Sequence, residues 1–438
     1  MKIAWFTPFA RKSAIGQYSR AVTDQLANDH EVHIWAPKTD EYLQTGIPLF
    51  KFGADGEVAR RMQEYDLSVY NIGDHFGYHH EIYEISKMHQ GVIVLHDYIM
   101  HHFFHYYYLQ QNDDPASYVH EMELLYGSGG KKIALDLIRG VEVPGWEFRI
   151  MDFPFYEKAI AGSLGVVCHS AYLAETVSSK SICPVCAARI PLSKDILNSS
   201  HIPFNRNLFS IPTDKAILLT MGNVNPNKRI DLVIECLGAS DKLRNNFVYV
   251  IIGSCEDALL QKYKSIVNGL NLRGAVHFLG YQTDEVLHGV MKAADIFINL
   301  RKPVMEGGSA SLVEQLSCGK PIIVSKAGHY AELPDDCVVK IDTANEKESL
   351  TNALCNFADH SELKPLIGSK GKEYQVINHN VSKYCETFNE FITVVRQHKP
   401  MLSLIDKAAL ELSSMRVSRD LSVVGSVTAE IFNIFADR

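Results

Sequence analysis

Two arrays of short apolar segments constrain the fold of this chain more than any other feature. In the first half, runs rich in valine, isoleucine and leucine begin at Lys2, Glu31, Asp66, Gly91 and Leu164. A second set begins at Ala216, Phe247, Ala275, Asp295, Pro321 and Cys337. Segments of helical length separate these runs, which is the pattern of parallel sheets covered on both faces by helices. We therefore expect an α/β protein with two such domains.

The polar stretch between the two arrays marks the domain boundary. Residues 196–215 are polar and contain two prolines, so we expect a linker there. The length of 438 residues is about three times that of a usual single domain, which leaves room for an appendage. We assign residues 1–195 to a first domain, 216–395 to a second and 396–438 to a helical tail. The balanced charge of the tail argues against a basic membrane-surface helix and favours a packed or oligomerising element.

Charge and composition exclude several classes of protein. The net charge of -8 gives no basic footprint for nucleic acid. Pro8 and Arg11 interrupt the first apolar run before it could act as a secretion signal, and no stretch reaches the roughly 18 apolar residues of a spanning helix. The nine scattered cysteines are typical of free thiols in a reducing compartment. We therefore expect a cytoplasmic protein with no nucleic-acid partner, in which any membrane contact would be peripheral.

The segment from Asn299 to Ser325 has the pattern of an anion-binding site. A strand end is followed by a glycine-rich turn and then by a helix. Glycines let the backbone approach a ligand closely, and free amides at a helix start attract phosphate oxygens. The residues that we expect to form this cradle are Gly307, Gly308, Ser309, Ala310 and Ser311.

Two glutamates lie on either side of the cradle. Glu306 precedes the turn, and Glu314 follows eight residues later, about two helical turns along, so both carboxylates can border one pocket. Two glutamates at this spacing, taken alone, are more typical of a solvated helix face. The adjoining Gly-Gly-Ser turn and the Gly-Lys-Pro sequence at 319–321 favour a binding site instead.

This segment resembles the retaining GT-B glycosyltransferases of family 4, the "group 1" transferases, whose signature is two glutamates separated by seven residues. The resemblance implies the GT-B fold, in which two Rossmann-like domains face each other across a cleft, here with a C-terminal helical appendage. It also implies that Glu306 contacts hydroxyls of the donor sugar and that Glu314 contacts the ribose. Members of the family typically need no catalytic metal, so we expect neither a metal nor a cofactor.

A second match follows the strand that opens the second array. Relatives commonly carry Gly-Arg there and a lysine several residues later, and both cations bind the diphosphate. Here Gly222 and Lys228 fit the pattern, but Asn223 stands where arginine is usual. We therefore expect Lys228 to be the main ligand of the diphosphate. Either Arg229 or Arg301 replaces the missing charge, or backbone amides make more of the contacts with the phosphates than in typical relatives.

Two residues of the first domain complete the resemblance. Residues 13–22 are similar to a glycine-containing loop of bacterial polysaccharide transferases, and Gly16 is the one glycine kept from the usual pair. The resemblance implies that Gly16 approaches the donor or the acceptor. His96 ends a predicted strand at the position where relatives place a histidine that hydrogen-bonds the transferring sugar. Read alone, Gly16 is a turn residue and His96 a structural histidine.

A concentration of histidines in the first domain raises the question of a metal. Two pairs have the i, i+4 spacing that places ligands on one helix face, but no HExxH sequence joins them. Cys183 and Cys186 form half of a zinc motif without a partner pair nearby. We therefore do not expect zinc. The histidines are His75, His79, His80, His96, His101, His102 and His105.

Aromatic residues crowd the long excursion 101–160 between two predicted strands. Such stripes are usually buried in a helical core, but aromatic faces also stack on sugar rings, so acceptor recognition stays open.

The resemblance implies a metal-independent retaining transferase that moves a hexosyl group from GDP-mannose or a UDP-hexose to a glycan or lipid-linked acceptor in polysaccharide biosynthesis. Lys228 and the cradle amides would stabilise the departing nucleoside diphosphate. Three alternatives remain from the sequence: a nucleotide-sugar epimerase, a phosphorylase of the same fold, and a non-catalytic nucleotide-sugar binder.

Overall fold

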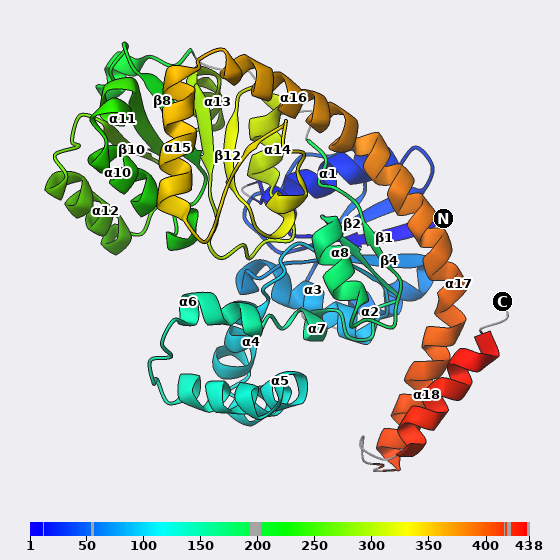
Figure 1. Ribbon diagram of the computed structural model, residues 1–438. Coiled ribbons are helices and arrows are strands. Elements are labelled where there is room, and N and C mark those ends of the chain that lie inside the picture. Colours follow the sequence, from blue (N-terminus) through cyan, green and yellow to red (C-terminus); the bar gives the residue numbers. More distant parts are fainter. Residues whose placement is uncertain (12, 54–56, 193–202, 416, 418–421, 436–438) are drawn as a thin grey trace. The chain divides into compact units, whose positions relative to one another are not determined.

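The computed structural model contains two parallel sheets, each in its own unit of the chain (Figure 1). It describes residues 1–11, 13–53, 57–192, 203–415, 417 and 422–435. The first unit comprises Met1–Pro144, Asp152–Ala188 and Ser382–Arg438, and the second comprises Gly145–Met151 and Arg189–Val381. Part of the predicted linker, residues 196–202, lies outside the described residues, as do residues 416, 418–421 and 436–438 of the predicted tail.

The first unit is built on a seven-stranded parallel sheet in the order β3-β2-β1-β4-β5-β6-β7. All five predicted strands of the first half are present, and β3 and β7 are additional short edge strands. Because edge strands are short and only half buried, their apolar pattern is weak. The strands are β1 (Lys2–Phe6), β2 (Glu31–Pro37), β3 (Leu49–Phe52), β4 (Leu67–Ile72), β5 (Val92–Leu95), β6 (Gly165–Cys168) and β7 (Val185–Ala187).

The second unit contains a six-stranded parallel sheet in the order β10-β9-β8-β11-β12-β13. Each of the six apolar runs predicted for the second array forms a strand. These are β8 (Ala216–Met221), β9 (Phe247–Ile252), β10 (Val276–Gly280), β11 (Ile296–Asn299), β12 (Ile322–Ser325) and β13 (Val339–Ile341).

Helices connect the strands in both units. Those of the first unit are α1 (Ala14–Leu26), α2 (Glu57–Arg61), α3 (Phe76–Met88), α4 (His101–Tyr106), α5 (Pro115–Ile138), α7 (Tyr156–Ala159), α8 (Ala171–Ser178), α17 (Val381–Ser414, whose first residue belongs to the second unit) and α18 (Ser422–Phe435). Those of the second unit are α6 (Trp146–Arg149), α10 (Ile230–Ala239), α11 (Asp241–Asn246), α12 (Asp257–Gly269), α13 (Asp284–Ala293), α14 (Ala310–Ser317), α15 (Glu346–Asp359) and α16 (Leu363–Asn378).

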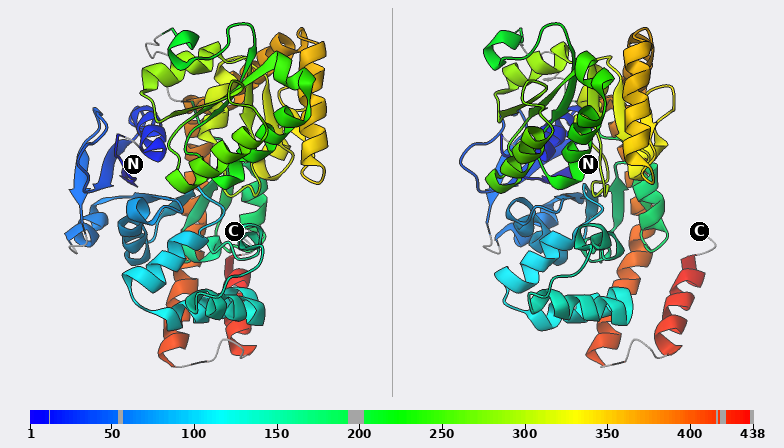
Figure 2. Two further views of the ribbon diagram at one scale, coloured as in Figure 1. Left: turned by 90° about the vertical axis from the view of Figure 1, so that its left-hand side faces the viewer. Right: turned by 60° about the vertical axis from the view of Figure 1, so that its left-hand side comes forward.

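Alternating side chains of the central strands pack on opposite faces of the second sheet. On β8, Leu218 lies in a cluster with residues of α10, α11, α12 and α15, whereas Ile217 and Leu219 lie in a cluster with residues of α13 and α14. Figures 1 and 2 show helices on both faces of this sheet. Burial on both faces explains why these strands read as continuous apolar runs in the sequence.

Residues 382–395, which the sequence places with the second array, pack with the first unit. The ring of Phe388 contacts Trp5 of β1 edge-on at 5.6 Å. A Cβ atom added at Gly165 of β6 would lie 2.7 Å from Val395 and 2.8 Å from Phe391, so the helix α17 rests directly on the sheet. Close packing of large apolar side chains therefore decides where this segment belongs.

The aromatic excursion of the first unit is mainly buried. Phe103, Phe104, Tyr118 and Phe155 are at most 2% exposed, and their rings pack against one another or against neighbouring aromatic side chains. The prediction of a helical aromatic core is confirmed for these residues. Tyr106 on α4 keeps 41% exposure, so acceptor recognition by an exposed aromatic residue stays a prediction.

Each sheet has one topological switch point. In the second unit the chain runs from β8 through β9 to β10 on one side, and then returns to β11 on the other side of β8. In the first unit the same change of direction occurs between β1 and β4. Because crossover loops leave a crevice beyond the carboxyl ends of strands at such a point, ligands bind there in open α/β sheets.

Candidate functional site

The strongest candidate site lies at the switch point of the second unit, in the loops after β8 and β11. Lys228 ends a short 3-10 helix, Pro226–Lys228, that follows β8. Arg301 and Glu306 follow β11 and act electrostatically on the Lys228 ammonium, which places the three charged groups near one another. The structure therefore brings together three of the residues selected from the sequence.

Lys228 is a buried cation held by the backbone. Its side chain is 6% exposed, and Nζ donates a 2.7 Å hydrogen bond to the carbonyl oxygen of Met221. No ion pair joins Lys228 to any residue in the described part of the chain. Burial, with a smaller contribution from Arg301, lowers the pKa of Lys228 to about 7. An anionic ligand would therefore find an ammonium that no carboxylate already neutralises.

The turn after β8 depends on glycine. Gly222 has a φ of 84°, in the left-handed region that favours glycine, and its amide donates to the carbonyl of Ile252. A Cβ atom added at Gly253 would lie 2.2 Å from the carbonyl oxygen of Gly222, so the turns after β8 and β9 touch through their backbones. Asn223 is exposed beside this turn.

Both arginines proposed to replace the missing charge already have carboxylate partners. Arg229 lies 3.1 Å from Glu346 and 3.9 Å from Asp231. Arg301 pairs with Glu306 at 3.0 Å and donates to the carbonyl oxygen of Leu300. Of the three cations selected from the sequence, Lys228 therefore has the clearest capacity to bind a phosphate.

Glu306 is a charged hydrogen-bond acceptor in the loop that follows β11. Its Oε1 accepts hydrogen bonds from Nε of Arg301 at 3.0 Å and from the Tyr330 hydroxyl at 2.9 Å. Burial alone would raise the pKa of Glu306, but Arg301 and then His329 outweigh it, and the pKa lies below the usual value. Glu306 is therefore ionised at neutral pH, as an acceptor for sugar hydroxyls must be.

The predicted cradle forms the start of α14. Ser309 is the N-cap, and its Oγ accepts from the amide of Leu312 and lies 3.1 Å from Oγ of Ser311. The amides of Ala310 and Ser311 lie in the first turn, where a helix has no internal acceptors for them. Gly307 and Gly308 precede the cap. The helix begins at Ala310, so a helix follows the glycine-containing segment as predicted, and binding of a phosphate by these amides stays a prediction.

Glu314 lies in the second turn of α14. Burial, with a smaller contribution from Asp284, raises the pKa of Glu314 to about 7. Asp284, which makes this contribution, is the first residue of α13. A partly protonated glutamate can donate as well as accept a hydrogen bond near neutral pH.

Sequence reasoning missed His329 and Tyr330. Both lie in the 3-10 helix Gly328–Glu332 that follows β12, and their rings are 4.0 Å apart. His329 is 7% exposed, and burial lowers its pKa to about 4. The signal that could have found them is position, because they follow a predicted strand at the carboxyl edge of the sheet.

Gly16 of the first unit lies near that unit's switch point. Its amide donates to Oγ of Ser13, the N-cap of α1. A Cβ atom added at Gly16 would lie 2.8 Å from the carbonyl oxygen of Pro8 and 3.2 Å from that of Ala10. Glycine is therefore required for α1 to approach the loop after β1, and a ligand contact stays a prediction.

Both ring nitrogens of His96 have protein partners. Nε2 lies 3.0 Å from Oδ1 of Asn71, and Nδ1 lies 3.1 Å from Nε2 of His169. The ring of Tyr18 packs edge-on against both imidazoles. Burial, followed by His169, lowers the pKa of His96 well below its usual value. His96 is thus part of a buried network, in which His169 was not foreseen, and its contact with a sugar stays a prediction.

The remaining histidines have separate roles. Within the described residues, no group of three histidine, cysteine or acidic side chains could hold a metal ion. His79 bonds the carbonyl of Asn71, His101 bonds Phe153 and Tyr118, and His102 pairs with Asp74 at 2.7 Å. Cys183 and Cys186 are free thiols. In the same part of the chain, no helix is long and apolar enough to cross a membrane.

Residues 202–372 match the model of the family "Glycosyl transferases group 1". An uncharacterized glycosyltransferase of Methanocaldococcus jannaschii is 25% identical over 212 residues, which cover 46% of this chain and 56% of that protein. The lipopolysaccharide 1,2-N-acetylglucosaminetransferase of Salmonella typhimurium is 23% identical over 192 residues, 42% of this chain and 50% of that protein. The chain thus spans about half the length of these relatives.

Among solved structures, Anabaena HepE in complex with UDP covers 90% of this chain and 100% of its own, with a TM-score of 0.58 and 14% identity. The likeness extends over both sheets and establishes the fold. The chain therefore has the GT-B fold, and its residues 202–372 are similar to the group 1 glycosyltransferases.

Proposed function

We propose that this chain transfers a hexosyl group from a nucleotide-diphosphate sugar to a hydroxyl group of a glycan or lipid-linked acceptor in polysaccharide biosynthesis, with retention of anomeric configuration and without a metal. One observation carries the proposal. Lys228 presents a buried ammonium without a carboxylate partner in the described chain, at the switch point of the second sheet and near Arg301 and Glu306.

The chemistry of the transfer requires such a cation. When the bond between the anomeric carbon and the phosphate oxygen breaks, negative charge develops on the leaving diphosphate. A preorganised ammonium and the first amides of α14 would stabilise that charge at little reorganisation cost. Ionised Glu306 would accept hydrogen bonds from the donor sugar, and Glu314 would bind the ribose.

Retention follows from the family resemblance, by attack on the face from which the diphosphate departs. The departing phosphate oxygen would accept the proton of the acceptor hydroxyl, so no separate protein base is needed. Of the two donor classes expected from the sequence, we place a UDP-hexose first. Support comes from Anabaena HepE, a protein of the same fold that was solved with UDP and with UDP-glucose.

The proposal is tested by incubating the purified chain with UDP-hexoses and GDP-mannose, with and without glycan and lipid-linked acceptors, and measuring nucleoside diphosphate release and the anomer of the product. We expect acceptor-dependent release with one donor class and an unchanged anomeric configuration. Lys228→Ala should lower the rate at least about 100-fold, whereas Lys262→Ala, at an exposed lysine of α12, should not change it. If none of the tested donors yields a nucleoside diphosphate, the proposal is contradicted.

The same assay separates the alternatives. An epimerase would isomerise the donor without an acceptor, a phosphorylase would require inorganic phosphate, and a non-catalytic binder would bind nucleotide without turnover.

A further inference from the structure

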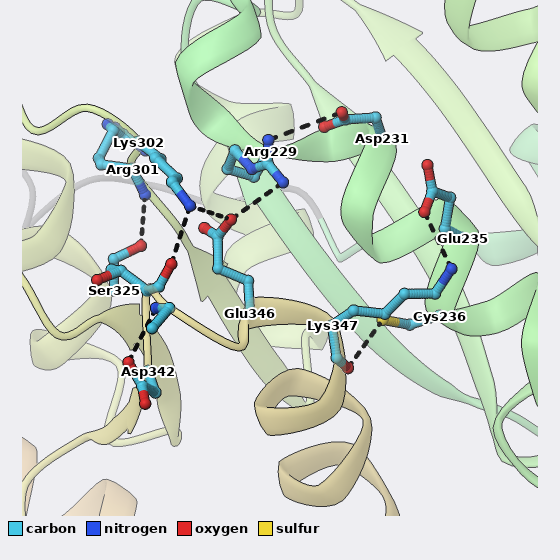
Figure 3. A network of polar contacts seen from close by, with 12 residues as sticks. Arg229, Asp231, Glu235, Cys236, Arg301, Lys302, Ser325, Asp342, Glu346 and Lys347 are labelled. Atoms are coloured by element: carbon cyan, nitrogen blue, oxygen red, sulfur yellow. Dashed lines mark hydrogen bonds and ion pairs between the residues drawn. The ribbon is translucent and has the colours of Figure 1, made fainter. Parts of the chain in front are cut away.

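An ion cluster centred on the buried carboxylate of Glu346 lies next to Lys228, and it includes Arg229, which the sequence predicts for the donor site. Glu346, the first residue of α15, is 8% exposed. Its Oε2 lies 3.1 Å from Nη2 of Arg229 and 2.9 Å from Nζ of Lys302 (Figure 3). Nζ of Lys302 also donates to the carbonyl oxygen of Thr343 at 2.9 Å. One carboxylate oxygen thus joins the loops that follow β8, β11 and β13.

Residues of the cluster contact the turn that contains Lys228, both before and after that residue. On one side, the amide of Lys302 donates a 2.8 Å hydrogen bond to the carbonyl of Asn227. On the other side, Arg229 is bound to Glu346. The backbone on either side of Lys228 is therefore held by these contacts, and the ammonium itself is held by the carbonyl oxygen of Met221.

Arg229 has a backbone conformation that needs compensation. Its φ of 55° lies in the left-handed region, which costs free energy for a residue other than glycine. Such a residue persists where its surroundings over-determine it, and the ion pairs with Glu346 and Asp231 are those surroundings. The ion pairs therefore stabilise a turn whose backbone is strained at Arg229.

We propose that Glu346 is a positioning residue for nucleoside diphosphate binding, which it serves by locking Arg229 and Lys302 so that the 225–229 turn holds Lys228 in place. This inference rests on the proposed function. It assigns Arg229 and Lys302 to the clamp, so neither cation is a phosphate ligand. We call Glu346, Arg229 and Lys302 the turn clamp.

Two variants open the turn clamp in different ways. Glu346→Gln keeps the shape of the side chain and removes its charge. Arg229→Gly removes the guanidinium while placing glycine where φ is left-handed, so the turn keeps a compatible backbone. If the loss of charge at Glu346 unfolds the protein, Arg229→Gly still decides the question. Glu235→Gln is the matched control, because it neutralises an exposed ion pair with Lys347 in the same region.

Isothermal titration of the full chain with UDP and GDP measures the effect. A displaced ammonium should weaken binding of whichever nucleotide the wild type binds by about 10-fold or more in both clamp variants. The double variant should bind no worse than the weaker single variant, because both changes open one clamp. Glu235→Gln should bind like the wild type.

The pH dependence of binding provides a readout that simple loss of stability would not change. Lys228 is faced by Arg301 and Glu306, and burial keeps its pKa low. In the clamp variants the ammonium should become more hydrated, so the pH at which affinity falls should move upward. If folded clamp variants keep the wild-type nucleotide affinity and the wild-type pH at which that affinity falls, the role of the turn clamp is overturned. Tighter nucleotide binding by these variants would also overturn it, because it would mean that Glu346 withholds Arg229 and Lys302 from phosphate. Neither outcome would affect the proposed function. Failure of the wild type to bind either nucleotide would overturn the proposed function as well.

Discussion

The hydroxyl of Tyr330 donates a 2.9 Å hydrogen bond to Oε1 of Glu306, and so joins the loop after β12 to the loop after β11. The same oxygen is bound by Arg301. Glu306 therefore receives two donors from two different loops, which fixes the direction in which its other oxygen points. We expect this bond to matter for catalysis because it orients the group that would hold the donor sugar.

Tyr330→Phe should lower kcat/KM about 10-fold, in line with the loss of a hydrogen bond to a charged group. It should leave the affinity for free UDP or GDP nearly unchanged, because Glu306 faces the sugar in the proposed reaction. Steady-state kinetics with the active donor and titration with the nucleotide measure the two effects. The control is Tyr281→Phe, at a tyrosine that is 67% exposed. An equal loss of kcat/KM in both variants would show that Tyr330 has no specific role in the site.

Nucleotide binding should be coupled to proton uptake. Since the pKa of Lys228 is about 7 in the free protein, the side chain is largely neutral at pH 8. A bound diphosphate favours the charged ammonium and raises this pKa, so binding at pH 8 should take up close to one proton, and affinity should fall as the pH rises above 7.

Calorimetry in buffers of different ionisation enthalpy measures that uptake. Lys228→Ala controls for the terminal phosphate of the nucleotide, which titrates near pH 6 by itself. Equal proton uptake in the two proteins would show that Lys228 does not titrate on binding.

Glu314 should make stability depend on pH in the opposite sense to an ordinary carboxylate. Burial raises its pKa from 4.5 to about 7, so the folded chain binds more protons than the unfolded chain between these values. Stability should therefore decrease as the pH rises from about 4.5 to 7, by a contribution on the order of 3 kcal/mol. Glu314→Gln should lose this dependence, whereas Glu348→Gln, at an exposed position, should keep it. Thermal unfolding at pH 5 and pH 7.5 compares the three proteins.

Gly16→Ala should destabilise the first unit. The added Cβ atom would lie 2.8 Å from a backbone oxygen, which cannot move as freely as a flexible side chain. We expect a loss of about 1–3 kcal/mol. Gly46→Ala is the control, because no atom lies within 4 Å of its added Cβ. Chemical denaturation of the two variants gives the comparison, and equal stability would show that α1 can shift away.

The fold was predictable because its strands are buried on both faces. Each of the eleven apolar runs identified in the sequence became a strand of one of the two sheets. The edge strands β3 and β7 were missed since half-buried segments of three or four residues leave little pattern. The attachment of residues 382–395 to the first unit could not be read from the sequence, because it depends on Phe391 and Val395 fitting against Gly165.

The candidate site was predictable where motif and strand order coincide. Lys228, Glu306 and the start of α14 could be selected because their motifs follow strands at the carboxyl edge of the sheet, and their contact with a ligand stays a prediction. Tyr330 and Glu346 were missed since their importance comes from partners distant in sequence: Tyr330 bonds Glu306, and Glu346 binds Arg229. The pairing of Arg301 with Glu306 likewise appears only in three dimensions.

A crystal structure of the chain with UDP or GDP would show where the nucleotide binds. We expect a diphosphate within hydrogen-bond distance of Nζ of Lys228 and of the first amides of α14, with Arg229 still paired to Glu346. A nucleotide bound away from the switch point of the second sheet, or a Lys228 ammonium that makes no contact with phosphate, would contradict it.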